Sequence, residues 1–120
     1  MSGVPEYPEL IEAVRVLAIE ESPLWEALQE VASRMPDKSE TERMEIAVRT
    51  VAHLLATDAV ELVWTLWTTT GVGVEWRVAS LADNETILSN PQYWHQTSRY
   101  ETYVELHYIY PGETPHHRLP

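Results

Sequence analysis

Apolar residues recur at helical spacing in the first half of the chain, in segments separated by proline-containing stretches. The first segment covers residues 10–18 and begins behind Pro8, a residue that helices tolerate at their first position. The second covers residues 24–35 and follows Ser22 and Pro23, which have the pattern of an N-cap and a first helical residue. The pattern predicts two helices, and the expected buried side of the second consists of Leu24, Leu28, Val31, Ala32 and Met35.

A third helix is the longest element that the sequence predicts, and we expect the rest of the chain to pack around it. Ser39 and Glu42 have the spacing of a capping box, in which each side chain satisfies a backbone N–H at the start of a helix. Asp58 can adopt the left-handed conformation that ends a helix. The expected buried face consists of Met44, Ala47, Val48, Val51, Leu54 and Leu55.

From Val60 onward the apolar period changes from the helical value to two, which is typical of strands. Residues 60–67 and 72–78 alternate in this way, and the Thr-rich turn between them predicts a hairpin. Residues 102–110 predict a last strand. Between the strands, residues 80–90 predict a short helix that ends before Pro91.

This order of elements predicts an α+β fold, in which three N-terminal helices precede a small antiparallel sheet with an inserted short helix. A chain of 120 residues is long enough for one modest hydrophobic core. We therefore expect residues 1–110 to form a single domain. Residues 111–120, PGETPHHRLP, have the composition of a flexible C-terminal tail.

The long third helix and its junction with the first strand, HLLATDAVELVWTLW, resemble the winged-helix family over residues 8–110. In that family the third helix reads DNA and the following strands form the wing. The chain is also similar to small uncharacterised bacterial proteins of winged-helix-like shape, in which a short helix and a Trp loop, here LADNETILSNPQYW, interrupt the wing. The resemblance implies that the DNA-reading positions would be Glu42, Arg43, Glu45, Arg49 and Thr50.

The charge of the chain argues against DNA as the ligand. Eight Lys and Arg residues stand against 19 Asp and Glu residues, a net charge of −11, and a surface of this kind repels phosphate. Glu42 and Glu45 would face the phosphates directly. We therefore expect a scaffold used for protein contacts, with a DNA-binding regulator as the alternative. A further alternative is an acidic mimic of nucleic acid, built on Glu9, Glu12, Glu20, Glu21, Glu26 and Glu30.

The composition also bounds the cellular setting. The chain has no Cys, so it forms neither disulfides nor thiolate metal sites. Its N-terminus lacks the pattern of a signal peptide, and no apolar run approaches the roughly 20 residues of a membrane span. These features predict a soluble cytoplasmic protein without contact to a membrane.

The aromatic residues suggest where a partner would bind. The chain has five Trp and six Tyr but no Phe, so each of these aromatic side chains carries an N–H or O–H group, as is common at interfaces. Trp67, Tyr103 and Ile109 fall on one strand face, and Trp25 lies off the apolar stripe of its helix. Together they predict an exposed interface and a homodimer. The alternative is that the helix at residues 80–90 folds over this face and buries it.

The same strand face is expected to carry a polar cluster of Glu61, Glu75, Arg77, Glu105 and His107. A His beside carboxylates can act as a general base, and an enzyme would require a concave pocket that contains His107 and Glu105. Alternating charges on a solvated strand face are nonetheless ordinary. Because no nucleophile or phosphate-binding Gly loop accompanies them, we predict no catalytic residues, no cofactor and no enzymatic activity.

Four histidines are candidate metal ligands. His116 and His117 are adjacent in the predicted tail, with His95 and His107 as possible additional ligands. Adjacent His side chains in an extended segment tend to point apart, and no Cys completes a ligand set. The sequence therefore predicts no built metal site.

Overall fold

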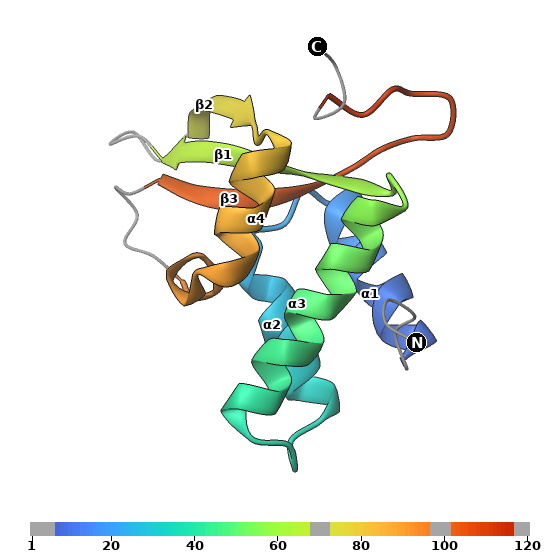
Figure 1. The fold of residues 1–120 in the computed structure, drawn as a ribbon, viewed down its shortest axis with the longest axis vertical. Coiled ribbons are helices and arrows are strands. Elements are labelled where there is room, and N and C mark those ends of the chain that lie inside the picture. The colour runs from blue at the N-terminus through green and yellow to red at the C-terminus, as the bar shows by residue number, and fades with distance from the viewer. Residues whose placement is uncertain (1–6, 68–72, 97–101, 117–120) are drawn as a thin grey trace.

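A computed structural model describes residues 7–67, 73–96 and 102–116, without the side chains of residues 66, 67 and 73–76. The chain forms an α+β fold with three N-terminal helices and a three-stranded antiparallel sheet, interrupted by a short helix (Figure 1). This confirms the predicted class and order. The elements are α1 (Pro8–Ile19), α2 (Trp25–Arg34), α3 (Glu40–Ala56), β1 (Val60–Trp67), β2 (Gly73–Val78), α4 (Leu81–Ser89), the 3₁₀ helix η1 (Pro91–Trp94) and β3 (Thr102–Tyr108).

Capping residues determine where two of the helices begin. The Ser39 hydroxyl accepts the Glu42 backbone N–H at 3.1 Å, and the Glu42 carboxylate accepts the Ser39 backbone N–H, so α3 begins with the predicted capping box. Ser80 and Asp83 form a second capping box at the start of α4. At the other end of α3, Asp58 has a φ of 58°, the predicted left-handed conformation. These local signals were therefore sufficient to place the ends of α3.

The second helix begins later than predicted, at Trp25 instead of directly after Ser22. The Ser22 carbonyl accepts the Leu106 N–H at 2.8 Å, and the Leu24 N–H donates to the Val104 carbonyl at the same distance. The segment 22–24 therefore pairs with β3, where Pro23 forms an isolated bridge with Glu105. The prediction was wrong because this long-range pairing uses the Ser22 backbone and no side-chain cap forms.

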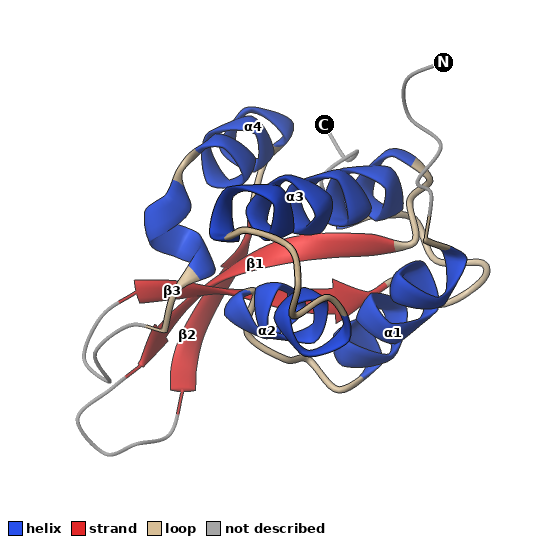
Figure 2. Ribbon diagram, turned by 90° about the horizontal axis from the view of Figure 1, so that it is seen from below, coloured by secondary structure: helices blue, strands red, loops and turns tan. Residues whose placement is uncertain are grey.

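The sheet has the order β2-β1-β3, and one of its faces packs on the helices. Figure 1 shows α1, α2 and α3 below the sheet, and Figure 2, viewed from that side, shows them in front of it. This helix face carries Leu62 and Trp64 of β1 and Val104, Leu106 and Tyr108 of β3. The buried core extends from it into all the helices, through Leu10, Val14, Ala18, Leu24, Ala27, Val31, Ala47, Val51, Leu54, Leu55, Ile87 and Trp94.

Residues 111–116, which the composition assigns to a flexible tail, turn back toward the sheet (Figure 1). The Tyr110 N–H donates to the Glu113 carboxylate and the Glu113 N–H donates to the Tyr110 carbonyl, which closes a turn. Gly112 occupies this turn with a φ of 91°, a conformation that side chains disfavour. The chain then reaches His116, which contacts Glu61 of β1.

None of the helices in the described part of the chain combines the length and the apolar character that a bilayer span requires.

Candidate functional site

The strand register decides which side chains share the face of the sheet opposite the helices. Antiparallel pairing places Glu61 beside His107, Val63 beside Glu105 and Thr65 beside Tyr103. We call this surface of β1 and β3 the polar face. It brings together three members of the predicted polar cluster, Glu61, Glu105 and His107, as the alternation on these two strands predicts.

The other two members of the predicted cluster lie elsewhere, so the five-residue cluster was wrong. Arg77 pairs with Trp64, and Glu75 pairs with Leu66. Trp64 and Leu66 are the β1 residues that alternate with the polar face, so their partners on β2 belong to the helix face. The alternation of apolar and polar residues within a strand does not show which face of the sheet each group occupies. A shift of one residue in the hairpin register moves every side chain of the strand to the opposite face. The Arg77 guanidinium lies 3.7 Å from the Asp83 carboxylate of α4 in an exposed ion pair.

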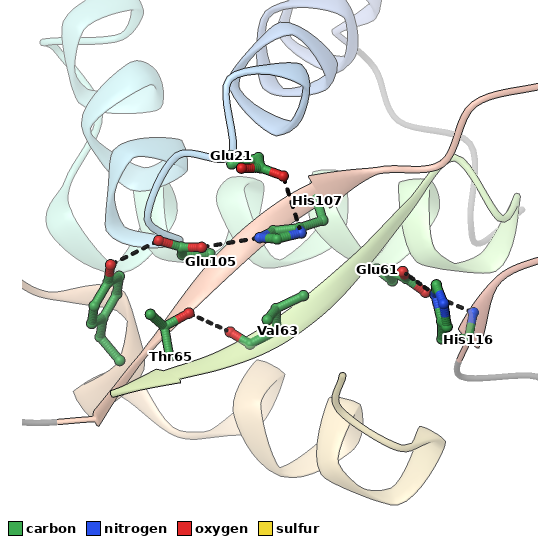
Figure 3. Close-up of polar contacts among 8 residues, drawn as sticks. Glu21, Glu61, Val63, Thr65, Glu105, His107 and His116 are labelled. Atoms are coloured by element: carbon green, nitrogen blue, oxygen red, sulfur yellow. Dashed lines mark hydrogen bonds and ion pairs between the residues drawn. The ribbon is translucent and has the colours of Figure 1, made fainter. Parts of the chain in front are cut away.

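A row of hydrogen-bonded side chains crosses the polar face (Figure 3). The Tyr103 hydroxyl donates to Glu105 Oε2 at 2.7 Å, and Glu105 Oε1 lies 3.0 Å from His107 Nε2. On the other side of the ring, His107 Nδ1 lies 3.6 Å from the carboxylate of Glu21, which comes from the α1–α2 connection. The imidazole is thus held between two carboxylates, in the arrangement that orients a general base.

The groups in this row adjust each other's ionisation. Burial by itself would raise the pKa of Glu105, but hydrogen bonds from His107, Tyr103 and Thr65 outweigh burial and hold the pKa below its ordinary value. The pKa of Tyr103 is raised far above its ordinary value, first by burial and then by the hydrogen bond to the Glu105 carboxylate. The structure therefore favours a neutral phenol beside an ionised carboxylate.

Glu61 forms a second polar contact on the same face. Its Oε2 accepts the His116 backbone N–H at 2.8 Å, and its Oε1 lies 2.8 Å from His116 Nδ1 (Figure 3). The Glu61 side chain is only 9% exposed, whereas that of His116 is 59% exposed. A buried carboxylate on β1 is thus satisfied by a residue 55 positions later in the chain.

A cavity of about 210 Å³ lies beside these contacts. It includes His107, as the enzyme hypothesis requires, but Glu105 does not line it. Within the described residues, no group of three or more His, Asp or Glu side chains is placed to hold a metal ion. His95 lies in a different depression, and His117 is outside the described residues. The cavity is lined by Glu21, Glu61, His107, Tyr108, Ile109, Tyr110, Glu113, Thr114 and His116.

The predicted aromatic interface is not an exposed patch. Trp25 and Tyr103 are each 7% exposed and Ile109 is 8% exposed, while the side chain of Trp67 lies outside the described residues. The rings of Trp25 and Tyr103 pack against each other with centroids 5.4 Å apart. The prediction of exposure was therefore wrong for Trp25, Tyr103 and Ile109. Trp25 and Tyr103 bury each other because their rings pack together.

The alternative cover, a helix at residues 80–90 folded over the aromatic residues, was also wrong. Helix α4 packs near the helix face, where its Asp83 accepts the indole N–H of Trp64 at 3.3 Å and its Ile87 joins the main core. Trp64 also packs edge-on against Tyr93 of η1. The inserted elements therefore extend the main core and do not cover Tyr103 or Ile109 as that alternative required.

The DNA-reading positions implied by the winged-helix resemblance are largely engaged within the protein. Thr50 is buried and donates to the Ile46 carbonyl. The Arg43 guanidinium donates to the backbone carbonyls of Met35 and Pro36, which it holds at the α2–α3 connection. Glu42 belongs to the capping box of α3. Glu45 and Arg49 are exposed, and their opposite charges give this part of α3 no net positive charge.

A groove between α2 and α3 is the larger of the two depressions described here, with a volume of about 500 Å³. Leu28 and Ala32 of α2 and Met44 of α3, which the sequence assigns to buried faces, are only partly covered there. Sequence reasoning missed this surface because periodicity shows an apolar stripe but not how far a neighbouring helix covers it. The lining consists of Leu28, Gln29, Ala32, Glu40, Thr41, Arg43, Met44, Glu45 and His95.

Comparison with protein-family models, curated proteins and solved structures gives no match for the chain.

Proposed function

We propose that the protein is a non-enzymatic interaction module on a winged-helix-like scaffold, and that its α2–α3 groove binds a basic amphipathic helix of a protein partner. The observation that carries the proposal is the groove itself, whose floor is formed by partly exposed Leu28, Ala32 and Met44. A volume of about 500 Å³ falls in the range of ligand-binding clefts, roughly 300–1,000 Å³. An amphipathic helix presents such side chains from one face, in the helix-in-groove mode of recognition.

The charges around the groove support a basic partner. Glu40 and Glu45 are exposed at its edge, whereas the guanidinium of Arg43, which also lines the groove, is already bonded to two backbone carbonyls. The chain as a whole carries −11. A second copy would bring the same negative charge, so a basic partner fits better than the homodimer that the aromatic residues suggested.

The same features speak for a protein ligand over DNA. A phosphate backbone near Glu40 and Glu45 would be repelled, and Arg43 and Thr50 have internal partners. An apolar floor of Leu and Met side chains instead gains free energy by covering its surface from water. The proposal includes a cytoplasmic location, which the sequence suggests.

A model peptide tests the groove. We would titrate the protein into a fluorescein-labelled helical peptide with Leu at positions i, i+3, i+4 and i+7 and Lys elsewhere, and measure anisotropy. A second peptide with Glu in place of Lys controls for charge. We expect the Lys peptide to bind and the Glu peptide not to bind.

Matched variants separate groove binding from attraction to an acidic protein. Ala32→Trp fills the groove, and we expect it to weaken binding about tenfold, the equivalent of roughly 1.4 kcal/mol. Glu45→Lys at the groove edge and Glu85→Lys on exposed α4 change the net charge equally. Glu45→Lys should weaken binding more than Glu85→Lys. Equal affinity of wild type and Ala32→Trp, with both proteins folded by circular dichroism, would refute the groove as the binding site.

A further inference from the structure

The C-terminal residues 110–116 form a strap that returns over the polar face. The strap begins after Ile109, whose N–H donates to the Ala59 carbonyl at the end of the sheet. The Tyr110–Glu113 turn reverses the chain, and Gly112 leaves open space around its Cα. The ring of Tyr110 packs edge-on against that of Tyr108 at a centroid distance of 4.8 Å, so the base of the strap rests on β3.

Among the residues that the structure describes, His116 joins the far end of the strap to the sheet. His116 makes two contacts with the Glu61 carboxylate of β1, one through its backbone N–H and one through Nδ1, each at 2.8 Å. Residues 110–114, between the base and this contact, are exposed to solvent. A segment with little buried surface between two points of attachment opens locally at a low free-energy cost.

The strap forms one wall of the polar cavity. Tyr110, Glu113, Thr114 and His116 supply the strap side, while Glu61 and His107 supply the sheet side. Release of His116 would remove that wall and admit water to the Glu61 carboxylate, which is 9% exposed in the closed form. It would also expose the cavity side of His107, whose side chain is 16% exposed.

We propose that the strap is a lid on the polar cavity, with the His116–Glu61 contact as its latch. When the lid is closed, it keeps dissolved molecules away from His107. Open, it presents the imidazole together with the carboxylates of Glu21 and Glu61. This device lies at the opposite end of the molecule from the start of α3 (Figure 1), so it does not rest on the proposed function of the α2–α3 groove.

Chemical labelling of His107 measures the opening of the lid. We would treat the full-length protein with diethyl pyrocarbonate, which modifies accessible imidazoles, and follow labelling of each His by mass spectrometry. In the wild type we expect His107 to react more slowly than exposed His95. His116→Ala removes the ring contact, and we expect it to raise the labelling rate of His107 about fivefold, as loss of one hydrogen bond implies.

Two further variants make the result specific. In His116→Asn the side-chain amide nitrogen can occupy the place of Nδ1 and donate to Glu61, so His107 should react at nearly the wild-type rate. His95→Ala, in the distant groove, should leave His107 unchanged. Amide exchange at Leu106, whose N–H donates to Ser22, should be the same in all variants if the opening is local.

Unchanged labelling of His107 in His116→Ala would overturn the proposal. So would equal acceleration in His116→Ala and His116→Asn, because the latch would then not depend on the hydrogen bond. A parallel rise in Leu106 exchange would show global unfolding in place of lid opening, and would also count against the lid.

Discussion

The two faces of the sheet are both largely buried, but they are buried in different ways. On the helix face, Leu62 and Leu106 are fully covered by helices and belong to one continuous apolar core. On the polar face, Glu61 is 6% exposed and Thr65 is 4% exposed, yet both are polar. The first face is covered by packing of large elements, whereas the polar groups of the second are satisfied by hydrogen bonds to one another and to short segments.

This difference shows that a strand with alternating polar residues does not necessarily have a solvated face. Glu61 is covered because His116 returns from the C-terminus, and the row through Glu105 and His107 is extended by Glu21 from the α1–α2 connection. Burial of polar groups is tolerated there because each finds a partner. A substitution on the helix face should therefore destabilise the protein by removing apolar burial. A substitution on the polar face should do so by leaving a polar group without its hydrogen-bond partner.

The largest effect is expected on the helix face. Leu106→Ala removes a fully buried side chain from the core and should lower the free energy of unfolding by about 3 kcal/mol through lost apolar burial and a residual cavity. Urea denaturation at neutral pH measures the change. Leu81→Ala on α4, where the side chain is 53% exposed, is the control and should cost less than about 0.5 kcal/mol. Similar losses in both would contradict the assigned core.

A smaller effect, with a distinctive pH dependence, is expected on the polar face. Glu105→Gln keeps the shape of the side chain but removes the charge that Tyr103 and His107 contact, and should cost about 1–2 kcal/mol at pH 7. Glu85→Gln on the exposed surface of α4 is the matched control. The free energy of unfolding of Glu85→Gln should equal that of the wild type.

The sign of the pH dependence follows from the lowered pKa of Glu105. A carboxyl whose pKa is lower in the folded state stabilises the protein above its unfolded pKa, here near 4.5, and this contribution is lost as the pH falls through the folded pKa. The stability difference between wild type and Glu105→Gln should therefore shrink from pH 7 toward pH 3 in urea denaturation. A difference that is constant over this range would show that the charge is not the cause.

The smallest effect is expected at the end of the polar row. Tyr103→Phe retains the ring that packs on Trp25 but removes the hydroxyl that donates to Glu105, and should cost about 1 kcal/mol. Because the pKa of Tyr103 is raised, its stabilisation is present below the ordinary value of 10.0 and is lost as the pH rises above it. As the pH rises above 10, the free energy of unfolding should therefore fall less in Tyr103→Phe than in the wild type. Tyr110→Phe, at a ring 53% exposed, is the control.

The helices show a parallel contrast between predicted and observed surfaces. The sequence assigned Leu28, Ala32 and Met44 to buried faces, and the structure leaves them partly open in the α2–α3 groove. Conversely, Trp25 was expected at the surface and is buried against Tyr103. Both differences have the same origin, because the apolar stripe of a helix is a local property while its cover depends on distant segments.

The sequence by itself determined the element order, the limits of α3 and the α+β class, since capping boxes, the left-handed Asp58 and the change of apolar period act over only a few residues. It also predicted that Glu61, Glu105 and His107 share a face. Only the tertiary structure decided that Glu75 and Arg77 lie on the opposite face of the sheet from Glu61, Glu105 and His107. It alone also decided that segment 22–24 pairs with β3 and that His116 contacts Glu61. These arrangements depend on strand register and on contacts between residues far apart in the chain, and no local pattern of residues encodes either.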